Sequence, residues 1–141
     1  MIVVLDTNVV LQALNPRHAH APIMDEWFSG RFVMAVSTDI LMEYREVIVR
    51  RSGEARWNTL DHLIRLATDY RKNMVHVSPS FFFRTITADR DDDKFADCAI
   101  TAHADWIVTE DSHFQALVGS GFKPQPIKPG DFISQVLARH P

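Results

Sequence analysis

Acidic residues at four places in the sequence could together bind a divalent metal ion: Asp6, Glu43, the run Asp91–Asp97, and Asp111. Carboxylate oxygens are hard ligands that select Mg²⁺ or Mn²⁺ over Zn²⁺, and none of the seven histidines has a zinc-ligand spacing with a cysteine or another histidine. A divalent ion held by carboxylates can polarise a phosphoryl oxygen and supply a bound hydroxide that attacks a phosphodiester. The sequence contains no competing nucleophile arrangement and no glycine-rich phosphate loop. These residues therefore predict metal-assisted hydrolysis.

Two of these acids follow predicted strands. Ile2–Leu5 is a short, continuous apolar run, typical of a strand that is covered on both faces, and Asp6 comes directly after it. Asp111 comes just after a second such strand, Trp106–Val108. Because parallel strands end at the same edge of a sheet, where α/β proteins bind ligands, we expect both carboxylates there. Either acid alone could equally be a helix-capping or turn residue.

Glu43 lies on a predicted helix that begins after the N-cap residue Ser37 and runs to about Arg50. The apolar residues of this helix form one stripe, and Glu43 falls roughly 100° from the centre of that stripe. This position is the boundary between core and solvent. Helix geometry therefore leaves two alternatives open: Glu43 lines a cleft at the sheet edge, or it points into water.

The acidic run Asp91–Asp97 opens a predicted helix that extends to His103. Asp93 and Asp97 lie one turn apart on this helix. Capping and the helix dipole explain one or two acids at a helix N-terminus. They do not explain four within seven residues, which would repel one another unless a cation neutralised them.

The remaining elements alternate between strands and helices along one predicted domain that spans residues 1–141. The expected strands are Ile2–Leu5, Phe32–Val36, Met74–Val77, Trp106–Val108 and Pro126–Ile127. The expected helices are Val9–Asn15, Pro22–Ser29, the one after Ser37, Glu54–Tyr70, Asp91–His103, Ser112–Val118 and Pro129–Arg139, with an irregular stretch between Ser78 and the acidic run. This order predicts an α/β fold with a central parallel sheet and right-handed crossovers.

The net charge of −3 is distributed unevenly along the chain. Eight acids lie between Asp89 and Asp111, and seven bases lie between Arg45 and Lys72. Such a molecule could hold cations at one place and phosphates at another, although the basic stretch could equally be a solvated helix surface. The single cysteine, Cys98, indicates a reducing, cytoplasmic location. No apolar run approaches the roughly 20 residues that span a membrane, so we expect no membrane association.

Four blocks of this sequence resemble, in the same order, the motifs of the PIN-domain family, and more narrowly of its VapC-like branch of toxin–antitoxin toxins. The blocks are Val3–Val10, Ile40–Glu46, Asp91–Ala99 and Ala104–Asp111. Each block alone is weakly specific, whereas four in register are strongly so. Residues 50–88 and the C-terminus carry no part of the resemblance.

The resemblance implies a three-layer α/β/α sandwich and a Mg²⁺- or Mn²⁺-dependent endoribonuclease. The four family acids correspond to Asp6, Glu43, Asp93 and Asp111, all of them expected metal ligands, with Asp97 as a weaker fifth ligand. The spacing to the end of the late strand selects Asp93 over Asp91 and Asp92. Polar positions beside the acids, where a side chain would orient a carboxylate or a water molecule, are Thr7, Asn8 and Thr109. The expected partners are an RNA substrate, a cognate antitoxin protein and a second copy of the chain in a homodimer.

Two other functions compete with this prediction. One is a non-catalytic PIN-fold module that binds RNA or protein, although all four acids are intact. The other is a phosphoacceptor signalling domain, which Lys128-Pro129 near a late strand would suit. Such a domain needs a pair of acids after its first strand, whereas Asp6 is followed by Thr7 and Asn8. DNA as the substrate stays open.

Overall fold

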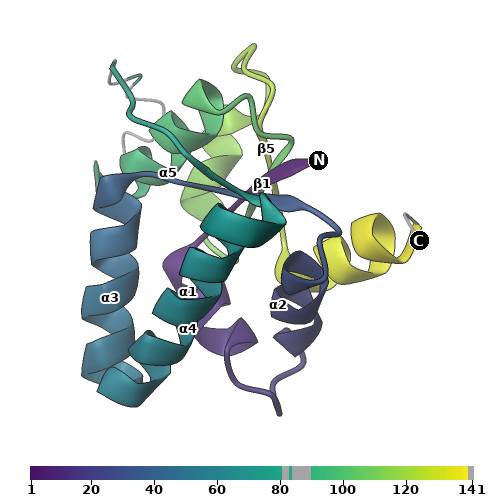
Figure 1. The fold of residues 1–141 in the computed structure, drawn as a ribbon. Helices are drawn as coiled ribbons and strands as arrows, with labels where there is room; N and C mark the ends of the chain where they lie inside the picture. Colours follow the sequence, from purple (N-terminus) through teal and green to yellow (C-terminus); the bar gives the residue numbers. More distant parts are fainter. Residues whose placement is uncertain (81–82, 84–89, 140–141) are drawn as a thin grey trace.

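A five-stranded parallel sheet forms the centre of the protein in a computed structural model that describes residues 1–80, 83 and 90–139 (Figure 1). The strands lie in the order β3-β2-β1-β4-β5, and all four strand pairs are parallel. Their bounds are β1 Ile2–Leu5, β2 Val33–Val36, β3 Met74–His76, β4 Trp106–Val108 and β5 Gln125–Ile127. The predicted α/β fold with a central parallel sheet is confirmed, and each predicted strand is present within one residue at either end.

Helices connect the strands and cover the sheet (Figure 1). They are α1 Thr7–Ala13, α2 Ala21–Phe28, α3 Thr38–Ser52, α4 Glu54–Leu66 with its π-helical extension η1 Ala67–Arg71, α5 Arg90–Thr101, the 3₁₀ helix η2 Ser112–Leu117, and the C-terminal series α6 Pro129–Asp131, η3 Phe132–Val136 and η4 Leu137–Arg139. The chain runs outward from β1 to β2 and β3, then crosses to β4 and β5 on the other side of β1. With right-handed crossovers, this reversal places helices on both faces of the sheet.

The reversal of strand order falls between β1 and β4. In α/β sheets a ligand binds outside the carboxyl ends of the strands at this switch point. The pairing of Leu5 with Val108 fixes the register here, and the backbone N–H of Asp6 donates to the carbonyl of Val108 at 3.0 Å. Asp6 and Thr109, the residues that follow this pair, therefore emerge side by side at the switch point.

Three of the predicted helices need correction, one in where it begins and two in the type of helix. The first helix begins at Thr7 rather than Val9, because Asp6 leaves the strand with φ −62° and ψ 150° and accepts a hydrogen bond from the N–H of Thr7. The predicted continuous helix Pro129–Arg139 is instead a succession of α, π and 3₁₀ turns. The adjacent residues Val136 and Leu137 are both buried there, as Val9 and Val10 are in the regular helix α1, so burial does not explain the irregular turns. The segment Ser112–Val118 was also predicted as a helix and is a 3₁₀ helix.

Other predicted features agree with the structure or fall outside it. Ser37 is the N-cap of α3, and its hydroxyl accepts from the N–H of Ile40 at 3.3 Å. The irregular stretch expected before the acidic run lies mostly outside the described residues. In the part of the chain that is described, no helix combines the length and the apolar character needed to cross a membrane.

The side chain of Asp105, the residue before β4, contacts the first residue of β1. Its carboxylate accepts from the N–H of Ile2 at 2.9 Å and pairs with Lys123 at 3.0 Å. Burial by itself would raise the pKa of Asp105, but the hydrogen bonds from Ile2 and Lys123 and the Lys123 charge outweigh it and lower the pKa. The charged carboxylate therefore stabilises the fold.

We expect Asp105→Asn to reduce the free energy of unfolding at neutral pH by about 0.5–1 kcal/mol, a modest loss because exposed ion pairs are screened. The folded-state pKa is depressed, so this stabilisation is complete above the unfolded pKa of about 3.9 and disappears as the pH falls through the folded value. Urea unfolding at pH 7 and pH 3 measures the difference, with Asp69→Asn, an exposed acid on η1, as control. A difference that stays constant between the two pH values would contradict the assigned charge effect.

Candidate functional site

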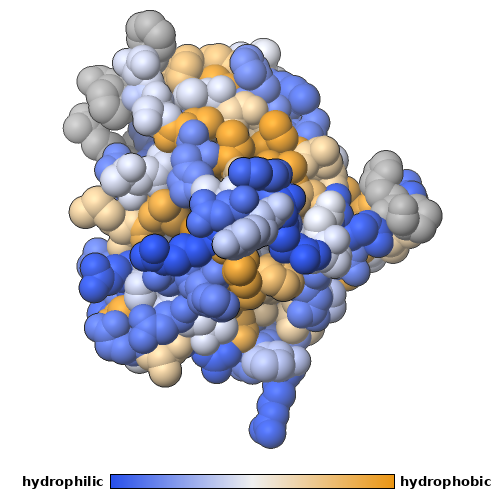
Figure 2. Space-filling model, in the orientation of Figure 1, coloured by the Kyte–Doolittle hydropathy of each residue, from blue (hydrophilic) through white to orange (hydrophobic). Residues whose placement is uncertain are grey.

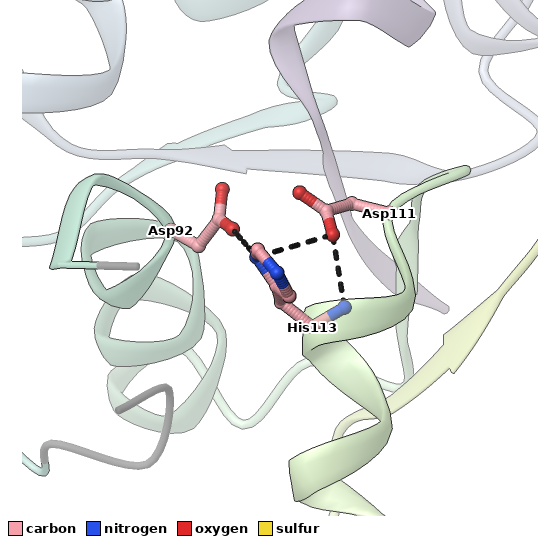
Figure 3. Close-up of side chains that lie close together, drawn as sticks. All are labelled: Asp92, Asp111 and His113. Carbon is pink, nitrogen blue, oxygen red and sulfur yellow. Dashed lines mark hydrogen bonds and ion pairs between the residues drawn. The ribbon is translucent and has the colours of Figure 1, made fainter. Parts of the chain in front are cut away.

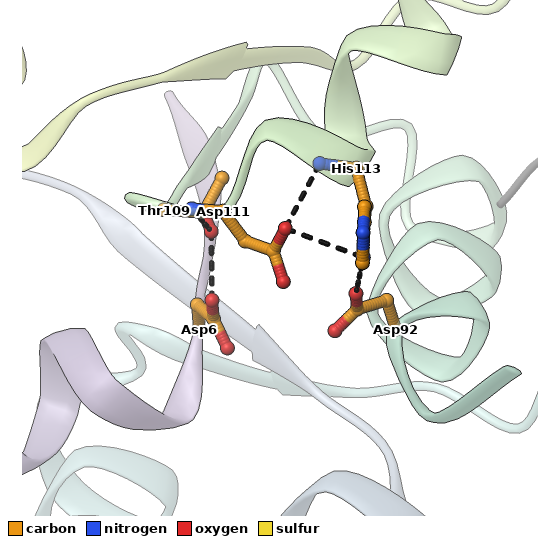
Figure 4. A network of polar contacts seen from close by, with 5 residues as sticks. All are labelled: Asp6, Asp92, Thr109, Asp111 and His113. Carbon is orange, nitrogen blue, oxygen red and sulfur yellow. Dashed lines mark hydrogen bonds and ion pairs between the residues drawn. The ribbon is translucent and has the colours of Figure 1, made fainter. Parts of the chain in front are cut away.

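Asp6 lies at the edge of the sheet near Asp111, and the hydroxyl of Thr109 contacts it (Figure 4). One carboxylate oxygen accepts from the N–H of Thr7 at 2.7 Å, and the other accepts from the hydroxyl of Thr109 at 2.7 Å. Burial raises the pKa of Asp6 despite these two hydrogen bonds, and the nearby charges of Glu43 and Asp111 raise it further. A cation bound at this place would offset both the burial and the repulsion.

Thr109 connects the acids of the two central strands. Its side chain is buried, with 3% of the residue exposed. The hydroxyl donates to Asp6 and accepts from the N–H of Asp111 at 2.9 Å. Thr109 therefore contacts the carboxylate of one acid and the backbone of the other, and its positioning role in a reaction stays a prediction.

Asp111 lies close to Asp92 and to a histidine that the sequence analysis did not single out, His113 (Figure 3). Asp111 is the N-cap of η2, and its carboxylate accepts from the N–H of His113 at 2.9 Å. The Nδ1 atom of His113 lies 3.2 Å from Asp92 Oδ2 and 3.4 Å from Asp111 Oδ1. One ligand atom from each of the three residues lies within 4.8 Å of the others. This group could hold a metal ion.

Glu43 lies beside Asp6 and belongs to the polar network of the site. It accepts a hydrogen bond from the hydroxyl of Thr7 and pairs with Lys94 on α5, whose Nζ is 2.7 Å from Glu43 Oε1. The two charged side chains are only 22% and 24% exposed. The neighbouring Tyr44 is buried, and its hydroxyl donates to the carbonyl of Leu5. Of the two alternatives left open by the sequence, the structure excludes a side chain that points into water, because Glu43 contacts Thr7 and Lys94 and is mostly covered.

The acids of α5 occupy different environments. Asp92 and Asp97 are both buried, but their partners differ. Asp92 contacts His113, and Asp97 accepts from the N–H of Phe83 at 3.0 Å. Burial and the charge of Asp93 raise the pKa of Asp97, although its hydrogen bond from Phe83 opposes this. Among the described residues, the group of possible ligands is Asp92, Asp111 and His113. Of the predicted ligands it contains only Asp111, and Asp6, Glu43, Asp93 and Asp97 lie outside it. The assignment of Asp93 as the third acid stays a prediction.

One predicted residue, Asn8, and one residue that was not predicted, His113, are still to be placed. Asn8 is exposed at the start of α1, so the structure gives no support to its predicted role beside the acids. His113 was missed because the histidines were considered only as partners of cysteine or of each other. The signal that could have found it is its position two residues after Asp111, in the turn that follows the same strand.

The residues at this edge fit a divalent cation. Several carboxylates converge on a half-buried site, and the pKa of Asp6 is raised by burial and by other carboxylates. The Lys94 ammonium pairs with Glu43, whereas among the described residues no lysine or arginine pairs with Asp6 or Asp111. Carboxylate oxygens with one imidazole nitrogen are a donor set that first-row divalent ions accept.

The predicted basic surface on α3 and α4 is only partly available for a nucleic acid. Several of its bases have partners: Arg50 and Arg65 pair with acids one helical turn away, Arg56 donates to the carbonyl of Leu14, and Arg71 lies over the ring of Phe28. Arg45 and Arg51 are exposed and form no ion pair with any residue that the structure describes. The visible surface over these helices is largely hydrophilic (Figure 2).

A cavity of about 590 Å³ adjoins the acids on the side of η2 and β5. Its lining includes Asp111 and Thr109 from the site, Gln115 from η2, and Lys128 at the end of β5. Lys128 is exposed, so its ammonium is accessible from solvent. The cavity is large enough for a small organic group beside the candidate metal centre.

Comparison with known proteins identifies the family. Residues 2–113 match the PIN domain family model, and the chain belongs to the PIN-domain family, as the four sequence blocks predicted. The crystal structure of VapBC2 from Rickettsia felis, bound to a DNA fragment from its promoter, contains a similar chain with a TM-score of 0.61 and 19% identity. The match covers 89% of this chain and 98% of that one, which supports the fold. No match was found among curated proteins.

Proposed function

We propose that this protein is a metal-dependent endoribonuclease that hydrolyses RNA phosphodiester bonds. The observation that carries the proposal is the convergence of Asp6, Asp92 and Asp111 at the switch point of the sheet, with Thr109 and His113 connecting them. Membership of the PIN-domain family supports the same conclusion. A carboxylate site at a strand edge, without a serine or cysteine nucleophile, suits metal-assisted hydrolysis.

The residues divide the work of such a reaction. Asp92, Asp111 and Asp6 would hold Mg²⁺ or Mn²⁺, and the predicted ligands Asp93 and Asp97 lie on the same helix. When bound, the ion would polarise the phosphoryl oxygen and lower the pKa of a water molecule. Glu43, held in place by Thr7 and Lys94, would orient the attacking water.

Contacts with the RNA would come from exposed basic side chains. Lys128 borders the cavity next to Asp111, and Arg45 and Arg51 are exposed on α3. Lysine and arginine bind the phosphate backbone, so binding should weaken as the salt concentration rises. A non-catalytic module that binds RNA would show the same salt dependence, and only cleavage separates the two functions.

The test is incubation of end-labelled RNA, single-stranded and structured, with the purified protein and Mg²⁺, Mn²⁺ or EDTA. We expect cleavage with either metal, none with EDTA, and recovery when metal is added back in excess. DNA of the same sequence tests the preference for RNA. Retention of RNA without cleavage under every metal condition would contradict the nuclease and favour the binding module.

We also propose a cellular role for this protein. The similar solved structure is that of VapBC2 with promoter DNA, which supports a toxin that is silenced by a cognate antitoxin in the cytoplasm. A homodimer is the proposed assembly. Co-expression with the product of an adjacent small gene, followed by affinity purification, would test the antitoxin partner. Measurement of the size of the purified protein would test the homodimer.

Thr109 provides a prediction that separates positioning from binding. Thr109→Val keeps the shape of the side chain but removes the hydroxyl that contacts Asp6 and the N–H of Asp111. We expect kcat to fall about ten- to a hundredfold, as for partners that orient metal ligands, with KM for RNA nearly unchanged. Steady-state cleavage kinetics measure this. Thr109→Ser, which keeps the hydroxyl, should restore most of kcat; failure of serine to do so would contradict the role.

A further inference from the structure

The imidazole of His113 is placed between two carboxylates of the candidate metal centre (Figure 3). Its Nδ1 atom lies 3.2 Å from Asp92 Oδ2 and 3.4 Å from Asp111 Oδ1. The backbone of His113 is fixed as well, because its N–H donates to Asp111 at 2.9 Å. The side chain is 42% exposed. The nitrogen therefore faces the acids from a fixed backbone position while the ring stays accessible from solvent.

The two distances from His113 Nδ1 to the carboxylate oxygens fit ligands of one ion, and all three atoms lie within 4.8 Å of one another. Metal–ligand bonds of about 2.1 Å at angles between octahedral and tetrahedral values separate neighbouring ligand atoms by roughly 3.0–3.4 Å. Both nitrogen–oxygen distances, 3.2 and 3.4 Å, lie in this range. A single Nδ1–H can donate well to only one carboxylate, and 3.4 Å is long for a hydrogen bond. One cation could bind all three atoms.

We propose that His113 is a direct metal ligand and that it makes the centre select first-row transition ions, represented by Mn²⁺, over Mg²⁺. The inference rests on the proposed metal-dependent function and specifies its cation. Mg²⁺ takes oxygen ligands almost exclusively, whereas imidazole nitrogen suits transition metals. Replacing one oxygen donor by His113 Nδ1 therefore favours Mn²⁺ relative to Mg²⁺ at this position.

The test is pulsed electron paramagnetic resonance of the full chain loaded with Mn²⁺, which detects hyperfine coupling to a directly bound nitrogen. Wild type is compared with His113→Asn and with a matched control, His62→Asn, an exposed histidine on α4. We expect the nitrogen coupling in wild type and His62→Asn and its loss in His113→Asn. We also expect the Kd for Mn²⁺ to rise about tenfold or more in His113→Asn, while the Kd for Mg²⁺, measured by competition, changes less than about twofold.

The possible results separate this inference from the nuclease proposal. Nitrogen coupling without RNA cleavage would support the His113 ligand and contradict the nuclease. Metal-dependent cleavage without nitrogen coupling would leave the nuclease standing and overturn the role of His113. Unchanged Mn²⁺ affinity in His113→Asn, or the absence of Mn²⁺ binding to wild type, would also overturn it. Thermal unfolding of each variant without metal verifies that the fold is intact.

Discussion

Asp6→Asn is expected to reduce the rate of RNA cleavage about a thousandfold or more, with the fold unchanged. The substitution removes the charge that would bind the cation but keeps the size of the side chain. Asparagine is a good N-cap residue, so its oxygen can still accept from the N–H of Thr7 or the hydroxyl of Thr109, as Asp6 does. The loss should therefore appear in kcat rather than in RNA binding.

The stability of Asp6→Asn provides an independent check on the same variant. Burial and the neighbouring acids Glu43 and Asp111 raise the pKa of Asp6, so its charge is costly in the metal-free fold. The metal-free variant should thus be as stable as wild type, or more stable by up to about 1 kcal/mol. Added Mn²⁺ should stabilise wild type only. Cleavage at the wild-type rate by a well-folded Asp6→Asn protein would refute the assignment, and Asp25→Asn, an exposed acid on α2, serves as control.

The central part of the site could be predicted because it depends on strands and their topology. Ile2–Leu5 and Trp106–Val108 are continuous apolar runs, which predict buried strands with little ambiguity. In a parallel sheet the residues that follow such strands share one edge, so the fold class predicts that Asp6 and Asp111 lie on that edge. The pairing of β1 with β4, which the sequence did not predict, brings them together. The contacts that Thr109 makes with both acids confirm this edge.

Side chains whose position depends on local helix geometry could not be placed in the same way. Glu43 lies at the edge of an apolar stripe, and its direction is decided by contacts with Thr7 and with Lys94 of another helix. His113 reaches the acids through a 3₁₀ turn capped by Asp111. The π turns near Val136 have no clear sequence signature. The position of Glu43 arises from packing between elements, whereas that of His113 arises from a local turn whose spacing from Asp111 was not used.

The sequence also could not decide which single acid of the run Asp91–Asp97 enters the site. Family spacing selects Asp93, whereas the group of possible ligands that includes Asp111 contains Asp92. The helix pattern alone does not decide between them, because Asp92 precedes the buried Phe95 by three residues and Asp93 precedes the buried Ala96 by three. Asp93 is rotated by about 100° from Asp92. A shift of one residue in register therefore decides which carboxylate enters the site.

Comparing Asp92→Asn with Asp93→Asn measures which of the two carboxylates belongs to the site. Asp92 is 8% exposed and contacts His113, so we expect Asp92→Asn to lower kcat about a hundredfold or more and to weaken Mn²⁺ binding. We expect Asp93→Asn to retain kcat within about tenfold, since its charge would act on the ion only from a distance. Cleavage kinetics and metal titration of both variants measure this difference.

The two variants control for each other, because each removes one negative charge from neighbouring positions of the same helix. A general loss of charge would affect both equally, and a loss of capping at the start of α5 would appear in their thermal unfolding. An inactive Asp93→Asn protein beside an active Asp92→Asn protein would show that the family spacing selects the right acid. The ion would then lie on the Asp97 side of α5, where Asp93 raises the pKa of that buried carboxyl, rather than against His113.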